Sequence, residues 1–256
     1  SLGKIKHYTW DVDHVQAHDK WEITDDYSDS FQPHFNRLDK MKSGTVILWQ
    51  NLDRLYEAEN YDKKWQHRIL GKVRNKAKAH ISMIFHKYAD EINFTLQGNL
   101  FPIKPWSPFY ENHMHTIASP AQKIQYKDST TYVQSFILPE EKYFLDEENF
   151  KGPTGNSTDR QGIYVYRKKR LIVPGGWHNI TSTRNKPIVG KEKYNRLRIM
   201  VDYDGKNDND WRLDVKKDSV IIPGYVSNQL SSIVAHQLDK LQKENYKVKP
   251  IKKQGT

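Results

Sequence analysis

The stretch that most constrains the fold is residues 161–177, QGIYVYRKKRLIVPGGW. It opens with a run of β-branched and aromatic side chains, which is the composition of a β-strand. Four consecutive cations follow: Arg167, Lys168, Lys169 and Arg170. The apolar run then resumes and stops at a Pro-Gly-Gly chain breaker. This pattern predicts a β-hairpin with an exposed basic tip, and an ordinary surface hairpin has the same pattern.

The composition is that of a folded protein. The chain has 256 residues, enough for one large domain or two modest ones, and 36% of them are hydrophobic and 12% aromatic. It has no Cys, which excludes a disulfide scaffold and a zinc–thiolate site. No apolar run approaches the ~20 residues of a membrane span, and no leader-like segment precedes the fold. We therefore expect a cytoplasmic protein with no membrane partner.

The chain is strongly basic, with a formal net charge of +10 and a pI near 9.4. This charge permits attraction to nucleic acid or to nucleotide phosphates, whereas a soluble Lys-rich surface would give the same value. The clearest helix, residues 61–90, has a basic face that is either solvated or in contact with phosphates. Its cations are Arg68, Lys72, Arg74, Lys76 and Lys78.

Hydrophobic periodicity predicts the remaining elements of an α+β chain, with mixed sheets and helices packed on one face. A second helix is expected at residues 225–245, and polar loops at 25–40 and 139–159. The expected strands are residues 4–11, 21–23, 46–49, 92–96, 100–103, 124–126, 131–138, 196–203 and 211–215.

Four segments, in order, are similar to the end of the ATPase domain and the transducer domain of GHKL ATPases. This superfamily includes gyrase B, MutL, the MORC proteins and the ninety-kilodalton heat-shock chaperones. The segments are SGTVILWQNLDRL at 43–55, INFTLQGNLFPIKPWSPF at 92–109, GIYVYRKKRLIVPGGW at 162–177 and YNRLRIMVDYDGKNDNDWRLDVKKDSV at 194–220. The closest resemblance is to bacterial MORC-like members, in which a pattern like that of the third segment recurs.

The resemblance implies a particular domain organisation. Residues 1–55 would be the remnant C-terminal strands of a GHKL ATPase sheet. Residues 56–256 would be a transducer-type βαβ domain with an inserted β subdomain and a basic tail. The family's Asn-bearing helix with its nearby Glu, its Asp-x-Gly-x-Gly turn and its Gly-rich lid do not occur in this sequence. We therefore expect this chain to be a C-terminal fragment, and we expect the missing N-terminal ATPase region to be its partner.

The same resemblance implies site residues. Gly44 and Thr45 would lie close to the adenine of ATP. Lys217 would reach the γ-phosphate, and its neighbour Lys216 would lie in the same nucleotide-binding loop. The intact protein would use ATP and Mg to close a homodimer, and Lys217 would be its catalytic contribution from this part. We expect no cofactor and no ATP hydrolysis in this chain alone.

Two other functions stay open. In one, the chain is a nucleic-acid-binding module whose basic hairpin tip and tail contact the phosphates of DNA. In the other, it is a scaffold with no ligand. A metal site is not expected, because the pair His14 and His18 lacks the Glu of a zincin helix and the pair His113 and His115 lacks a third ligand nearby.

Overall fold

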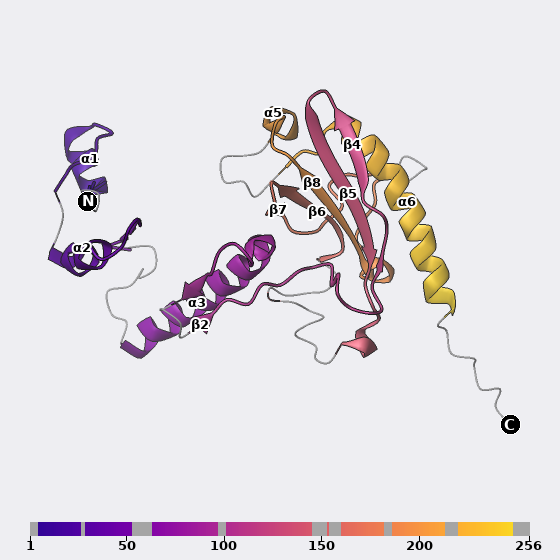
Figure 1. Cartoon of the computed structure of the whole chain (residues 1–256), viewed down its shortest axis with the longest axis horizontal. Coiled ribbons are helices and arrows are strands. Elements are labelled where there is room, and N and C mark those ends of the chain that lie inside the picture. Colours follow the sequence, from indigo (N-terminus) through magenta and orange to yellow (C-terminus); the bar gives the residue numbers. More distant parts are fainter. Residues whose placement is uncertain are drawn as a thin grey trace. The chain divides into compact units, whose positions relative to one another are not determined.

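A computed structural model describes residues 5–26, 29–52, 63–96, 101–144, 153, 160–181, 186–212 and 220–247 (Figure 1). The chain divides into two compact units, Ser1–Ile69 and Leu70–Thr256, and the boundary falls within one continuous helix. In the described part of the chain, no helix is both long and apolar enough to span a membrane.

Helices occur in both units. The α-helices are α1 (Val12–His18), α2 (Gln32–Leu38), α3 (Lys63–Ile84), α5 (Asp208–Trp211) and α6 (Gly224–Lys247). The short 3-10 helices are η1 (Asp29–Phe31), η3 (His86–Tyr88), η5 (Glu141–Tyr143) and η7 (Glu192–Tyr194). The strands are β1 (Thr95–Leu96), β2 (Phe101–Pro102), β3 (Ile117–Ala118), β4 (Gln122–Tyr126), β5 (Ser129–Ile137), β6 (Gly162–Arg167), β7 (Arg170–Val173) and β8 (Leu197–Tyr203).

The second unit contains a mixed sheet of six strands, so the expected α+β class is confirmed. Along the sheet the order is β3-β5-β8-β6-β7, and β4 also pairs with β5. The central pair β6 and β8 is parallel, whereas the β5–β8, β4–β5 and β6–β7 pairs are antiparallel. β1 and β2 form a separate two-stranded ladder, as the pattern of residues 92–103 predicts.

Apolar residues are buried on both faces of the sheet. Successive side chains along a strand point to opposite faces. In β6, Ile163 and Val165 belong to one buried cluster, which includes the apolar residues of α6. Tyr164 and Tyr166 belong to a second cluster, which includes Met83 and Ile84 at the end of α3. The expectation that helices pack on one face only is therefore wrong: the alternating apolar residues of β6 leave two faces to cover.

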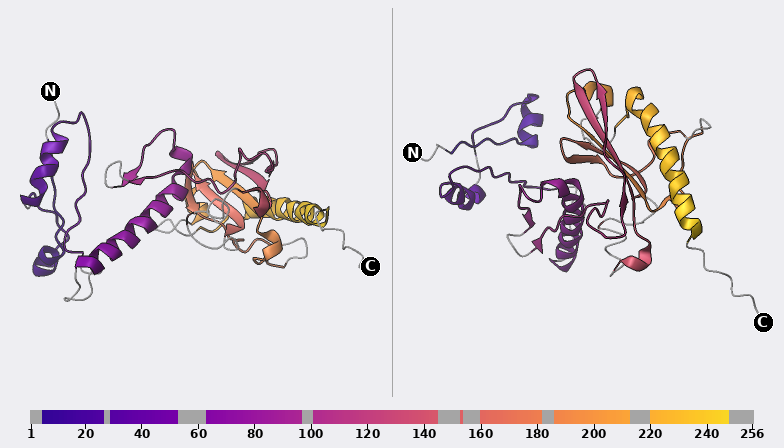
Figure 2. Two further views of the ribbon diagram at one scale, coloured as in Figure 1. Left: turned by 90° about the horizontal axis from the view of Figure 1, so that it is seen from below. Right: turned by 45° about the vertical axis from the view of Figure 1, so that its right-hand side comes forward.

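Helix α6 lies along one face of the sheet, where it contacts β5 and β8 (Figures 1 and 2). Its fully buried residues recur at helical spacing, which forms the apolar stripe that the sequence predicts. They are Val226, Leu230, Val234 and Leu241.

The hairpin at residues 162–173 is confirmed, with β6 paired to β7 and only Lys168 and Lys169 in the turn. At its base the chain after β7 returns to the start of β6, where the backbone N of Ile163 donates to the carbonyl of Gly176 at 2.7 Å. Gly162 has φ +97°, and a Cβ there would lie 2.3 Å from the Gly176 oxygen. Only glycine fits this close approach of two backbones.

Several strands predicted from alternation are also present. β4, β5 and β8 overlap the ranges expected at 124–126, 131–138 and 196–203. The two long helices are α3 and α6, close to the expected ranges 61–90 and 225–245. The strand expected at 211–215 is wrong at the two residues described. Trp211 is the last residue of α5, and Arg212 caps that helix in the left-handed conformation. The rest of that range lies outside the described residues.

In the first unit, the expected loop at residues 25–40 is wrong. It contains η1 and α2, and Pro33 occupies the first turn of α2. Proline is tolerated there because the first backbone N–H groups of a helix have no partner within the helix. Phe31 and Phe35 lie one turn apart with their ring centroids at 5.8 Å, which supports the helical conformation.

The strands expected at 4–11, 21–23 and 46–49 are also wrong for the residues described. Around the first two, a single isolated bridge joins Thr9 to Thr24, and Asp11 caps the start of α1. Residues 46–49 form no strand, and Ile47 and Trp49 are 75% and 78% exposed. An apolar run forms a strand only where another strand supplies its backbone hydrogen bonds.

Candidate functional site

Lys216 and Lys217 lie outside the described residues, but the structure describes the chain on both sides of them. The backbone N of Ile221 donates to the carbonyl oxygen of Trp211 at 3.0 Å. Trp211 is fully buried, and its ring stacks on Tyr203 with centroids 4.2 Å apart and planes 11° apart. The residues that flank the two lysines are therefore joined to each other and to the end of β8.

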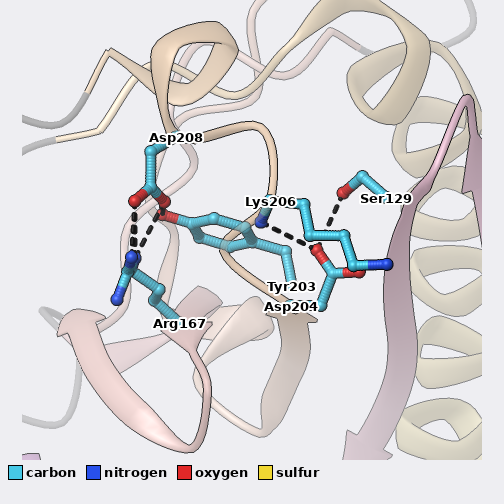
Figure 3. A network of polar contacts seen from close by, with 6 residues as sticks. All are labelled: Ser129, Arg167, Tyr203, Asp204, Lys206 and Asp208. Atoms are coloured by element: carbon cyan, nitrogen blue, oxygen red, sulfur yellow. Dashed lines mark hydrogen bonds and ion pairs between the residues drawn. The ribbon is translucent and has the colours of Figure 1, made fainter.

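A polar network holds α5 against the end of the sheet (Figure 3). The Arg167 side chain donates to Asp208 from Nε at 2.8 Å to Oδ1 and from Nη2 at 2.5 Å to Oδ2. The Tyr203 hydroxyl also donates to Asp208 Oδ1, at 3.1 Å. Hydrogen bonds from Arg167 hold the pKa of Asp208 below its usual value, whereas burial raises the pKa of Tyr203. Asp208 is therefore a charged acceptor that fixes α5.

A second carboxylate ties the β4–β5 turn to the loop after β8 (Figure 3). Asp204 accepts from the Ser129 hydroxyl at 3.0 Å, from the backbone N of Thr130 at 2.9 Å and from that of Lys206 at 3.0 Å. Although desolvation alone would raise its pKa, these hydrogen bonds lower it. Asp204 therefore has a structural role, because donors of the protein already bind its carboxylate oxygens.

The hairpin turn is made by two lysines in the left-handed conformation, with φ of 48° at Lys168 and 70° at Lys169. A two-residue turn of this kind usually contains Asn or Gly. Contacts from other elements support it: the Lys168 N donates to the Tyr203 carbonyl at 3.0 Å, and the Tyr88 hydroxyl donates to the Lys168 carbonyl at 2.6 Å.

Of the four cations at the predicted basic tip, two are ion-paired. Arg167 binds Asp208, and Lys169 binds Glu91. Arg170 is half-buried, with its guanidinium 5.5 Å from the centre of the Phe85 ring. Lys168 is exposed. Most of the charge that the sequence places at this tip is thus used within the protein.

Gly44 and Thr45 belong to the first unit, where they line a hollow of about 470 Å³. Its wall combines aromatic, apolar and basic side chains. The lining includes Lys6, Tyr8, Phe31, Phe35 and Lys42. This arrangement offers ring faces and two ammonium groups, which suits a planar ligand that carries negative charge.

The described residues contain no cluster of His, Cys, Asp or Glu that could hold a metal ion. His14 and His18 stack with centroids 4.2 Å apart, and His14 Nε2 lies 3.0 Å from Glu22. The carboxylates of the polar network, Asp204 and Asp208, are occupied by donors of the protein. The geometry around α5 therefore suits holding this helix in place, not proton transfer.

No sequence pattern pointed to the roles of Tyr203, Asp208 and Trp211. Asp208 stands in a polar stretch, residues 204–210, that predicts a turn, and its partner Arg167 is 41 residues away. The one available signal was Trp211, a large apolar residue within that polar stretch.

No protein-family model matches this sequence, and no curated protein matches it.

Proposed function

We propose that this chain is the C-terminal part of a GHKL-type ATPase, most similar to bacterial MORC-like members. In this proposal residues 56–256 are the transducer domain, and Lys217 contacts the γ-phosphate of ATP that the N-terminal ATPase region binds together with Mg. ATP binding would then close a homodimer, because a lysine that contacts only bound ATP stabilises only the closed state.

The observation that best supports this proposal is the anchoring of the chain around Lys216 and Lys217. The Trp211–Ile221 hydrogen bond and the Arg167–Asp208 pair fix both flanks at one end of the sheet. A lysine between fixed flanks has the reach of a four-carbon stem and presents a compact charge to a phosphate. Such a charge stabilises phosphoryl transfer most when its position is set before the reaction.

The hollow beside Gly44 and Thr45 is a second support. A Cβ at Gly44 would lie 3.1 Å from Leu38 Cδ2 and 3.4 Å from Met41 Cε, so glycine keeps the backbone close to the apolar wall. The Thr45 hydroxyl would serve as a hydrogen-bonding group for an adenine placed there.

The experiment is a comparison of two variants in the longer, ATPase-containing protein. Lys217→Ala should reduce ATP turnover by about 100-fold, the usual effect of removing one preorganised donor to the developing charge. It should also reduce ATP-driven dimerisation, measured by light scattering. Lys216→Ala should change both much less, and thermal unfolding checks that both variants stay folded.

Wild-type turnover in both variants would overturn the assignment of a phosphate contact. A loss confined to Lys216→Ala would keep the mechanism and move the contact by one residue. The reading frame upstream of Ser1 provides an independent check: it should encode an Asn-bearing helix with a nearby Glu and an Asp-x-Gly-x-Gly turn.

A further inference from the structure

Strand β8 carries a buried arginine that has no carboxylate partner in the described part of the chain. Arg198 is only 2% exposed. Its Nη1 donates to the carbonyl oxygens of Asn195 and Leu197 at 2.6 and 3.0 Å, whereas its Nε is buried without a hydrogen-bond partner. A guanidinium stays charged in a protein, and neutral carbonyls do not cancel its net charge.

The neighbouring Arg196 shows the usual arrangement. It is half-buried, and its Nε donates to the Leu138 carbonyl at 2.8 Å. Burial lowers its pKa, but Glu140 and Glu244 lie close enough to oppose this effect. Burial also lowers the pKa of Arg198, and the groups that oppose it are the tyrosines Tyr164 and Tyr110. Arg198 thus lacks the negative charge that its neighbour has.

A second buried arginine, Arg160, lies near Arg198. It is 5% exposed, and its guanidinium lies 5.1 Å from the centre of the Trp106 ring. Burial raises the pKa of Tyr110 and of Tyr164, and both arginines oppose this because a nearby cation favours the phenolate. Two guanidinium groups therefore approach the same pair of hydroxyls.

Moving a cation from water into the interior is unfavourable unless an opposite charge accompanies it. A second cation nearby adds repulsion. The face of the Trp106 ring offsets part of the charge of Arg160. Arg198 has no such compensation from an acid of the described residues, so this part of the sheet is incomplete without an anion.

We propose that Arg198, with Arg160 beside it, binds the phosphate group of a small ligand. The planar fork of a guanidinium donates two parallel hydrogen bonds to phosphate oxygens. A phosphate monoester carries nearly two negative charges at neutral pH and several acceptor oxygens, whereas a carboxylate carries one charge. It can therefore bind Arg198 and contact Arg160 as well.

Tyr110 and Trp106 complete the site. Trp106 Nε1 donates to the Tyr110 hydroxyl at 3.0 Å, which leaves the Tyr110 proton as a donor to the ligand. The two rings pack edge to face with centroids 6.2 Å apart. Both are half-buried, so part of each reaches the surface and marks the side from which a ligand approaches. An aromatic group attached to the phosphate would pack against them.

This site is separate from the anchoring of α5. Arg198 is the second residue of β8, and Tyr203, which donates to Asp208, is its last. At about 3.3 Å per residue, the two lie about 17 Å apart along the strand. The proposal therefore does not depend on Lys217 or on ATP binding by the longer protein.

The test is isothermal titration calorimetry of the 256-residue chain in a phosphate-free buffer at neutral pH. The probes are inorganic phosphate, phenyl phosphate and acetate. The variants are Arg198→Lys, Arg198→Gln and Arg160→Gln, and Arg196→Gln is the matched control. Thermal unfolding checks that each variant is folded. Arg160→Gln keeps the test decisive if the changes at Arg198 prevent folding.

We expect the wild-type chain to bind at least one phosphate probe with a dissociation constant of about 1 mM or lower. Arg198→Lys should weaken binding by at least about tenfold, because an ammonium cannot donate two parallel hydrogen bonds. The two Gln variants should weaken it further, since each removes a charge, and Arg196→Gln should bind like the wild type. Tighter binding of phenyl phosphate identifies a monoester as the ligand, whereas tighter binding of inorganic phosphate identifies the free ion.

Three results would overturn the proposal. The first is that the wild-type chain binds neither phosphate probe at about 10 mM, ten times the expected dissociation constant. The second is a loss in Arg196→Gln as large as that in Arg160→Gln, which would reduce the effect to net charge. The third is binding of acetate in preference to both phosphate probes, which would make the ligand a carboxylate.

Discussion

Arg167 donates to Asp208 from two nitrogen atoms, and this pair joins the end of strand β6 to helix α5 across 41 residues of sequence. The Tyr203 hydroxyl donates to the same carboxylate, and the Tyr203 ring stacks on the buried Trp211. Two side chains from adjacent, parallel strands thus hold the short helix that leads toward Lys216 and Lys217. The pair is partly exposed, with 31% of the Arg167 and 37% of the Asp208 side chain accessible, so water screens it.

Asp208→Ala should lower the free energy of unfolding by about 1 kcal/mol. This value lies below the range for fully buried hydrogen bonds to charged groups, because the pair is screened by water. Urea denaturation measures it. A double-mutant cycle with Arg167→Ala should show a favourable coupling energy of the same order, since each single change already removes the contact.

Asp210→Ala is the matched control, because Asp210 is an exposed acid on the same short helix. Its effect should stay within about 0.5 kcal/mol. Equal losses at Asp208 and Asp210, or a coupling energy of zero, would mean that the Arg167–Asp208 pair does not hold α5.

Gly162→Ala should prevent stable folding. Its Cβ would lie 2.3 Å from the Gly176 oxygen and 2.8 Å from the Gly176 carbon, and both are backbone atoms that cannot rotate away. The φ of +97° adds strain for any other residue. Soluble expression and thermal unfolding report the outcome.

Gly71→Ala provides the opposite result in the same protein. A Cβ at Gly71 meets nothing within 4 Å, and the residue lies inside α3. Alanine there should stabilise the chain by about 0.5–1 kcal/mol, because glycine loses more backbone freedom in a helix. A Gly162→Ala protein as stable as wild type would contradict the close approach of the two backbones.

Stability should fall as the pH drops below 6.5, in part because of His86. Burial lowers the pKa of His86 from its ordinary value of 6.5, although a hydrogen bond to the Met83 carbonyl opposes this. The unfolded chain therefore takes up a proton at a higher pH than the folded protein. Below pH 6.5 protonation favours the unfolded chain, with a slope of at most about 1.4 kcal/mol per pH unit for one group.

The measurement is urea denaturation between pH 5 and 7.5. His86→Gln should flatten the dependence, and His178→Gln should do the same, because burial also lowers the pKa of His178. His80→Gln is the control, since His80 is exposed on α3. A His80→Gln protein that flattens the curve as much as His86→Gln would show that burial is not the cause.

The 256-residue chain alone should neither hydrolyse ATP nor bind it at micromolar concentration. The sequence lacks the family's Asn-bearing helix, its Glu and its adenine-binding turn, and with them the family's magnesium ligand and general base. Isothermal titration calorimetry and a phosphate-release assay measure both properties. Micromolar affinity or turnover would exclude the proposal that the chain is an incomplete part of the enzyme.

The β6–β7 hairpin shows how far local patterns reach in this protein. A strand-forming run, a polar turn and a Pro-Gly-Gly stop lie within 17 residues, and no distant contact is needed to recognise them. The hydrophobic periodicity of α3 and α6 is equally local. The run at 46–49 shows the opposite case, because its apolar composition predicts a strand while Ile47 and Trp49 are exposed.

The sequence by itself determined the hairpin, the two long helices and the positive charge of α3, since each depends on side chains within a few turns or strand residues of each other. The tertiary structure alone decided that β6 runs parallel to β8, that Arg167 meets Asp208, and that Lys169 meets Glu91. These relationships join residues far apart in the chain. Which distant groups meet depends on how the whole sheet and its two buried faces pack, and no local pattern records that choice.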